Sequence, residues 1–132
     1  MKNKIFLGID VGTKHIGCAI NTISNNVSSI KILNVIKIRK NNIEYVKINK
    51  IIEHWKPEAI VLGIPYNNQF TFFFIKKISK IISIRYNIKI FFICENFTSW
   101  EAKKLYLKNK ERTNSYSAMI ILKSFLINNF FL

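Results

Sequence analysis

Residues 4–20 constrain the fold of this chain more than any other stretch. Residues 4–10 form an apolar run of strand length that ends at Asp10, and residues 15–21 form a second apolar run. The link between them contains Gly12 and is short, so we expect two antiparallel strands joined by a tight turn. Asp10 is the only aspartate in the sequence. A lone carboxylate at a strand end, followed by a glycine and a Thr-Lys pair, indicates a site that handles a metal ion or a phosphate.

The rest of the pattern predicts an α/β domain. After a loop rich in Asn and Ser at 21–29, the alternation from Ile30 to Ile38 predicts a third strand with one solvated face. Continuous apolar runs at 59–65 and 88–94 are typical of parallel strands that are covered on both faces. Helical spacing predicts helices over 43–55 and 70–86, and helix-capping residues predict two more over 98–107 and 114–131. In the second of these we expect four apolar residues to face inward: Phe74, Ile78, Ile81 and Ile82.

This order of elements predicts one domain over residues 1–132. An antiparallel meander of three strands would be extended by two parallel strands, which gives a mixed five-stranded sheet with helices on both faces. Cys18 and Cys94 lie far apart within apolar strands, as small core residues do in a reducing compartment. No apolar run reaches the roughly 20 residues of a membrane span. We therefore expect a cytoplasmic protein without a membrane partner.

The charge balance narrows the choice of partner. The chain has a formal net charge of +14, with 21 Lys and Arg against 7 Asp and Glu. A basic domain of this size favours a polyanionic partner, most often nucleic acid. The alternative is that the lysines merely solvate the surface of a chain that is 49% apolar. The positions of the charges, rather than their sum, must decide between the two.

Three predicted strands end at positions where chemistry could be located. In such a sheet, functional groups gather at the carboxyl ends of the parallel strands. Asp10, Pro65 and Glu95 come at these ends, and Asn114 at the start of the last helix could complete the cluster. Two carboxylates and an amide oxygen suit a hard cation such as Mg²⁺ or Mn²⁺. Beside a basic surface, that donor set favours metal-assisted hydrolysis of phosphodiester bonds.

Four segments in the same order resemble a known family. They are residues 8–17 (GIDVGTKHIG), 61–65 (VLGIP), 95–102 (ENFTSWEA) and 114–122 (NSYSAMIIL). Together they resemble the YqgF family, the RuvX-type Holliday-junction resolvases, which are also described as pre-16S rRNA nucleases. The resemblance covers nearly the whole chain. It implies a ribonuclease H-like fold and a nuclease of ribosome biogenesis that processes the 5′ end of pre-16S rRNA, with a resolvase-like endonuclease on branched DNA as the alternative.

The resemblance also implies a site, and the chain departs from the family pattern within it. Asp10 keeps the acidic residue of the first motif, and Glu95 keeps the glutamate of an Asp-Glu-Arg-Leu-Ser/Thr motif whose flanks have changed. Asn114 stands where a third carboxylate is usual, so the implied catalytic and metal-binding residues are Asp10, Glu95 and Asn114. The change to Asn removes one negative charge, which predicts weaker metal binding. A nucleic-acid-binding module that has lost catalysis therefore stays open.

Each of these residues has a second interpretation. Asp10 could be a turn residue that bonds its own backbone, and Asn114 could be only a helix cap. Lys14 could contact a phosphate or be a solvated turn lysine. The same choice holds for three basic residues of the connection before the last helix: Lys108, Lys110 and Arg112. The aromatic cluster at 70–74 belongs to the core or to an interface, and an exposed part of it could support a homodimer.

A third interpretation is nucleotide binding. Residues 10–13 (DVGT) also resemble the first phosphate-binding hairpin of sugar kinases and actin-like ATPases. Those proteins close two such domains around the nucleotide, and we expect 132 residues to provide only one.

Overall fold

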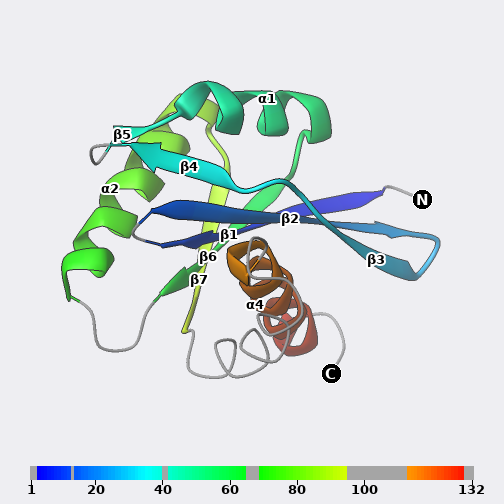
Figure 1. Cartoon of the computed structure of the whole chain (residues 1–132). Helices are drawn as coiled ribbons and strands as arrows, with labels where there is room; N and C mark the ends of the chain where they lie inside the picture. The colour runs from blue at the N-terminus through cyan, green and yellow to red at the C-terminus, as the bar shows by residue number, and fades with distance from the viewer. Residues whose placement is uncertain (1–2, 13, 40–41, 65–68, 95–112, 130–132) are drawn as a thin grey trace.

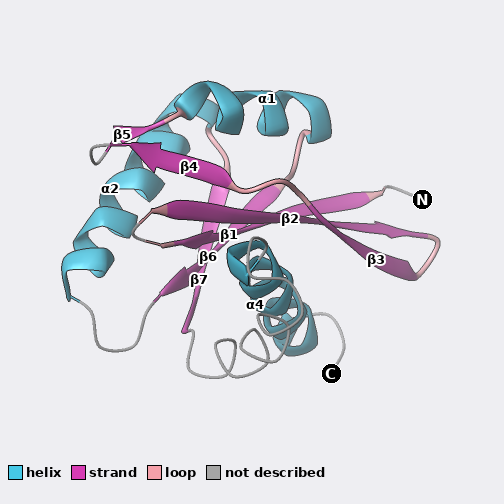
Figure 2. Cartoon of the chain, viewed as in Figure 1, coloured by secondary structure: helices cyan, strands magenta, loops and turns pink. Residues whose placement is uncertain are grey.

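The fold is a mixed α/β architecture, which confirms the predicted fold class. The computed structural model describes residues 3–12, 14–39, 42–64, 69–94 and 113–129. The elements in chain order are β1 (Lys4–Val11), β2 (His15–Ser24), β3 (Val27–Ile32), β4 (Ile36–Arg39), β5 (Asn42–Ile43), α1 (Tyr45–Trp55), β6 (Ala59–Ile64), α2 (Gln69–Tyr86), β7 (Lys89–Cys94) and α4 (Thr113–Asn129). Figure 1 shows a central sheet with α1 and α2 on one face and α4 on the other, and Figure 2 shows the same view by type of element.

β1 occupies the middle of the sheet. It pairs with β2 in antiparallel fashion and with β6 in parallel, and β7 continues the parallel side. The strand order is β5-β4-β2-β1-β6-β7, with β3 also paired to β2. The described residues thus form seven strands, whereas the sequence pattern predicts five. The two additional strands arise from a break in the predicted third strand and from the two-residue β5.

The predicted continuous strand from Ile30 to Ile38 is wrong. β3 pairs with the outer half of β2, whereas β4 pairs with its first residues through the couples His15–Lys37 and Ile16–Ile36. Residues 33–35 between them leave the ladder, although the Leu33 N–H still donates to the Cys18 carbonyl at 2.9 Å. The predicted third strand is therefore two strands, β3 and β4, which both pair with β2 and are separated by a bend at residues 33–35.

The predicted loop at 21–29 is also wrong, because only two residues of it form a turn. β2 continues to Ser24 and β3 begins at Val27. Asn25 and Asn26 between them have φ of 51° and 65°. Two successive residues with positive φ define a type I′ hairpin turn, and asparagine tolerates that conformation better than most residues. The Asn-rich composition therefore marks a tight hairpin.

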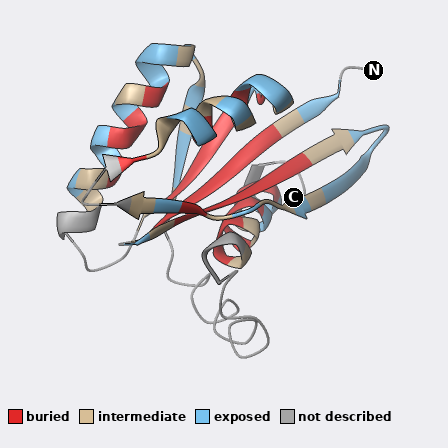
Figure 3. Ribbon diagram, turned by 45° about the horizontal axis from the view of Figure 1, so that its top comes forward, coloured by how far each residue is buried: buried red, intermediate tan, exposed pale blue. Residues whose placement is uncertain are grey.

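Alternation along the central strands divides the core into two layers. Odd-numbered residues of β1 face α1 and α2, together with buried isoleucines of these helices: Ile48, Ile52, Ile75, Ile78 and Ile82. Even-numbered residues of β1 face α4, which contributes Ala118, Ile121, Leu122, Phe125 and Leu126. Figure 3 shows the buried residues concentrated in the central strands. β1 is therefore covered on both faces, which explains its uninterrupted apolar sequence.

The helices differ from the predictions in detail. α1 ends at Trp55, and Lys56 adopts the left-handed conformation while its N–H donates to the Ile52 carbonyl at 2.8 Å. In α2 the expected inward residues Phe74 and Ile81 are only half-buried, and Ile75 is buried instead. The buried stripe is thus rotated slightly from the predicted one. The helix predicted at 98–107 lies outside the described residues, and within them no helix is long and apolar enough to cross a membrane.

Gly8 lets α4 approach the sheet closely. A Cβ atom at this position would lie 2.5 Å from Leu122 Cγ and 2.8 Å from the Ala118 carbonyl oxygen. The second contact is with the helix backbone, which cannot move aside as a flexible side chain can. A side chain at Gly8 would therefore push the helix away from β1.

We expect Gly8→Ala to lower the free energy of unfolding by about 1–3 kcal/mol, the usual cost of overpacking a tight core. Urea unfolding followed by circular dichroism measures this change. Ile84→Ala, at a residue of α2 that is 74% exposed, is the matched control and should change stability by less than about 0.5 kcal/mol. An equal effect of the two substitutions would contradict the close approach.

Candidate active site

Asp10 lies near the carboxyl end of the central strand. It is the next-to-last residue of β1 and is only 9% exposed. The parallel register places Ile9 opposite Leu62 of β6, and Leu62 opposite Phe92 of β7. The carboxyl ends of all three strands therefore meet at one end of the sheet, as the sequence predicts. Asp10 is the buried carboxylate that the described residues contribute there.

The start of α4 comes to the same place. The ring of Phe6 packs against Phe125 with their centroids 5.5 Å apart, while Gly8 meets Ala118 and Leu122, so α4 is antiparallel to β1. Asp10 follows two residues later on the same face of the strand. Two strand residues span about 6.6 Å and four helical residues about 6 Å. The register thus brings the first turn of α4 to the level of Asp10.

The structure brings together part of the predicted site. Asp10 and the helical turn that contains Asn114 share one end of the sheet. Glu95 follows the last residue of β7 directly in sequence and lies outside the described residues, as do Lys108, Lys110 and Arg112. Within the described part of the chain, no group of three His, Cys, Asp or Glu side chains could hold a metal ion. The predicted three-ligand site therefore stays a prediction.

Lys14 lies at the same end of the molecule, in the turn between β1 and β2. Its side chain is exposed, while its carbonyl accepts a hydrogen bond of 2.8 Å from the N–H of Ile38 in β4. The Gly12 N–H donates to the His15 carbonyl, also at 2.8 Å. The turn is therefore anchored on both sides, and it presents the Lys14 ammonium to solvent near the carboxyl end of β1.

Cys18 sits on β2 directly opposite Ile9, with its side chain in the layer that faces α1 and α2. It is 1% exposed. Burial, and to a smaller extent the negative charge of the Asp10 carboxylate, raise the pKa of its thiol from 9.0 to about 12. The thiol is thus neutral in the folded protein, as expected for a core residue.

Ser117 is a residue that sequence reasoning missed. It belongs to α4 and is one of the few buried polar residues of the described chain, at 8% exposure. It lies in the second turn, one helical turn before Ile121 of the sheet-facing layer. The available signal was its position in an apolar helix shortly after Asn114. The buried Ser117 residue therefore places a hydroxyl group near the start of α4, whereas the rest of the layer between α4 and the sheet is apolar.

The family of the chain follows from comparison with known proteins. A family model described as "RuvX: Holliday junction resolvase" matches residues 4–128. The chain belongs to the RuvX family. Membership of this family makes it a nuclease, a hydrolase that acts on phosphodiester bonds. The predicted family and reaction class are therefore confirmed.

Relatives in several bacteria match over nearly their full length. The protein of Buchnera aphidicola subsp. Baizongia pistaciae is 33% identical, with 93% of this chain and 96% of the relative covered. That of Coxiella burnetii is 30% identical, with 95% and 94% covered, and that of Wigglesworthia glossinidia brevipalpis is 31% identical, with 98% and 96% covered. All three carry the name "Putative pre-16S rRNA nuclease".

Solved structures share the fold. RuvC of T. thermophilus in complex with a Holliday junction superposes with a TM-score of 0.65 at 9% identity, over 96% of this chain and 97% of RuvC. The fowlpox virus Holliday junction resolvase gives a TM-score of 0.59 at 14% identity, over 94% and 98%. These similarities confirm the ribonuclease H-like fold.

The Cys18 thiol makes the stability of the fold sensitive to alkaline pH. The unfolded thiol ionises above pH 9 and the folded one only near pH 12, so the unfolded state loses its proton first. Stability is therefore fully present below pH 9 and decreases above it. We expect the wild type to lose about 1 kcal/mol more than Cys18→Ala between pH 8 and pH 10.

Urea unfolding of both proteins at the two pH values measures this difference. Lysine, tyrosine and Cys94 are common to both proteins, so their titration cancels in the comparison. Parallel loss of stability in the two proteins would show that Cys18 is not buried as a neutral thiol.

Proposed function

We propose that the chain is a metal-dependent nuclease that processes the 5′ end of pre-16S rRNA in the cytoplasm. The observation that carries the proposal is the buried Asp10 carboxylate, which lies at the carboxyl end of the central strand and level with the first turn of α4. A buried carboxylate has a high desolvation cost, which a bound cation offsets. The names of the bacterial relatives favour pre-16S rRNA as the substrate.

We propose Mg²⁺ or Mn²⁺ as the cofactor, held by Asp10, Glu95 and Asn114. Carboxylate and amide oxygens are the donors that these hard cations prefer, so the residue types fit the ion. When bound, the cation would neutralise charge that develops on the scissile phosphate. Asp10 has the burial expected of a ligand that must keep a fixed orientation. Because Asn114 is neutral, the site has less negative charge than three carboxylates would provide, which favours a single ion.

The chain's basic residues would hold the substrate backbone. Lys14 is exposed on an anchored turn beside the end of β1, where it can pair with a phosphate near the cleaved bond. Lys108, Lys110 and Arg112 would extend this contact from the connection before α4. Their role is electrostatic and independent of base sequence, as for most phosphate contacts. A homodimer stays a further prediction.

A second candidate function is cleavage of branched DNA. The matching family model is described as a Holliday junction resolvase, and the fold neighbours include resolvases bound to such junctions. Both functions need the same hydrolysis of a phosphodiester bond, so they differ only in the nucleic acid that is bound. Competition between a pre-16S rRNA fragment and a four-way DNA junction for the same protein separates them.

We expect the wild-type protein to cleave a pre-16S rRNA fragment in the presence of Mn²⁺. Asp10→Asn should reduce the rate at least about 100-fold, because changes even beyond the direct ligands of a metal commonly cost 10–100-fold. Asn114→Asp should increase the rate, since it adds a charge to the proposed site. A gel-based cleavage assay with all three proteins measures these effects, and circular dichroism checks that each is folded.

The remaining outcomes separate the alternatives. Cleavage by Asp10→Asn at the wild-type rate would contradict the proposed role of Asp10. An inactive wild type with an active Asn114→Asp variant would mean that the fold persists while its metal site has decayed. If all three proteins are inactive yet bind the RNA in a salt-sensitive way, the chain is a binding module.

A further inference from the structure

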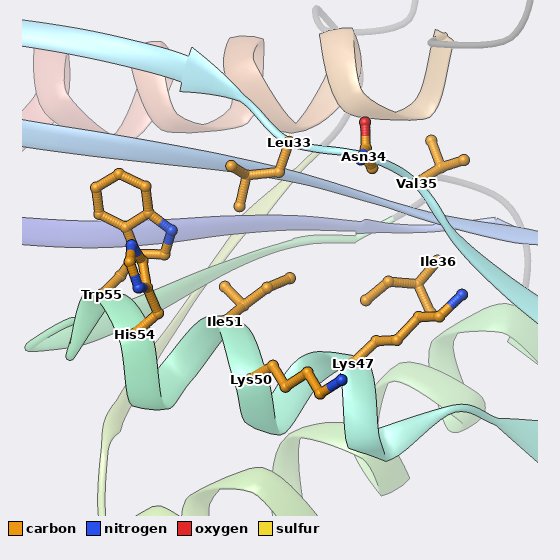
Figure 4. A pocket seen from close by; sticks show the side chains of 9 residues that line it. All are labelled: Leu33, Asn34, Val35, Ile36, Lys47, Lys50, Ile51, His54 and Trp55. Carbon is orange, nitrogen blue, oxygen red and sulfur yellow. The ribbon is translucent and has the colours of Figure 1, made fainter.

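A pocket lies on the face of the sheet opposite to Asp10 and α4. It opens between α1 and the bend that joins β3 to β4 and has a volume of about 400 Å³. The lining residues are Leu33, Asn34, Val35, Ile36, Lys47, Lys50, Ile51, His54 and Trp55. Figure 4 shows Trp55 and His54 at one end of the pocket, Ile36 and Lys47 at the other, and Leu33 across from Ile51 in the middle. No role in the proposed cleavage uses these residues.

The walls of the pocket are apolar and partly aromatic. Leu33 and Ile51 are half-buried and pack against the core, and Trp55 does the same at the end of α1. The bend at 33–35 keeps this segment out of the sheet ladder, so its side chains form one wall of the pocket and α1 forms the other. The Trp55 ring thus borders a slot with apolar walls, at the end where the His54 ring packs at right angles against it with the centroids 5.0 Å apart.

The rim of the pocket is basic. Lys47, Lys50 and His54 recur at helical spacing along one side of α1, and no acidic side chain lines the pocket. The Lys31 ammonium also lies 5.9 Å from the centre of the Trp55 ring. Glu44 pairs with Lys47 at 2.9 Å and reduces its charge. Lys50 has no acidic partner among the described residues, so the side of α1 that borders the pocket keeps a positive charge between Lys47 and His54.

We propose that this pocket binds an unpaired nucleotide of a nucleic-acid strand. A base can lie in the apolar slot against Trp55, because aromatic side chains stack on any base. Lys50 and Lys31 are then placed to contact the flanking phosphates, which are the anions that lysine rims attract. The volume is within the usual range of about 300–1,000 Å³ for small-ligand sites and is large enough for one nucleotide. The distance from the Lys31 ammonium to the Trp55 ring is near the outer limit of about 6 Å for a cation–π contact. A base can therefore displace the ammonium from the ring.

This site would act outside the catalytic end of the sheet. Asp10 faces the α4 layer, whereas the pocket belongs to the α1 side, so a nucleotide held there is not the one that is cleaved. The proposal goes beyond the proposed function, because it assigns a second contact to a single-stranded part of the bound nucleic acid. It does not depend on metal binding or on cleavage.

Binding of a short oligoadenylate RNA in EDTA tests the proposal without any cleavage. Trp55 becomes the sole tryptophan in a Trp100→Phe background, so its fluorescence reports on the pocket directly. We expect the RNA to quench this fluorescence, and the double variant Lys31→Gln/Lys50→Gln to weaken binding at least about fivefold.

The matched control is Lys77→Gln/Lys80→Gln, which removes the same number of positive charges from exposed lysines of α2. It should weaken binding by less than about twofold. Equal weakening by both double variants, or RNA binding without a change in Trp55 fluorescence, would overturn the proposal. So would equally tight binding of AMP alone, which indicates a free-nucleotide site, or of poly-glutamate, which indicates a site for acidic protein segments. Because the assay contains EDTA and follows Trp55, loss of pocket binding is distinguishable from loss of cleavage.

Discussion

The contact of α4 with Gly8 is the interaction on which the rest of the structure depends. Because β1 has no side chain there, the helix backbone comes within van der Waals distance of the strand. That approach fixes the register between helix and strand, and the ring contact of Phe6 with Phe125 holds it from the other side. The level of Asp10 relative to the first turn of α4 follows from the same register. A packing constraint in the core therefore determines the geometry at the end of the sheet where the active site is proposed.

The two proposed sites lie on opposite faces of the sheet. On the α4 face, a carboxylate is buried at the end of the central strand, where hydrolysis is proposed. On the α1 face, the described residues combine apolar walls with lysines at the pocket rim. β1 and β2 contribute alternate residues to both layers, so a single pair of strands supports both regions. The rigid sheet would then hold two parts of one nucleic acid at a constant separation.

Much of this arrangement could be predicted from the sequence, because buried strands and amphipathic helices leave strong periodic signals. The position of Asp10 followed from an apolar run that ends in a carboxylate. The bend at 33–35 could not be predicted, since its residues continue the apolar alternation and leave the ladder only because β2 pairs with two segments. The two-residue turn at Asn25–Asn26 could not be predicted either, because asparagine is equally common in long loops and in tight hairpins. The slight rotation of α2 depends on packing against the sheet, which a helical period does not specify. Glu95 and the basic connection lie outside the described residues, so their predictions stand on sequence alone.

The late position of α4 in the chain has a consequence for synthesis on the ribosome. All described strands of the sheet precede it, and among the described helices α4 is the one that packs on the layer of Phe6, Ala19, Ala59 and Val61. A nascent chain that ends before residue 113 therefore has these strands but lacks α4. The contacts between α4 and this layer form only after the last helix is made, and chaperone binding to the apolar side chains that α4 later buries would be strongest before that point.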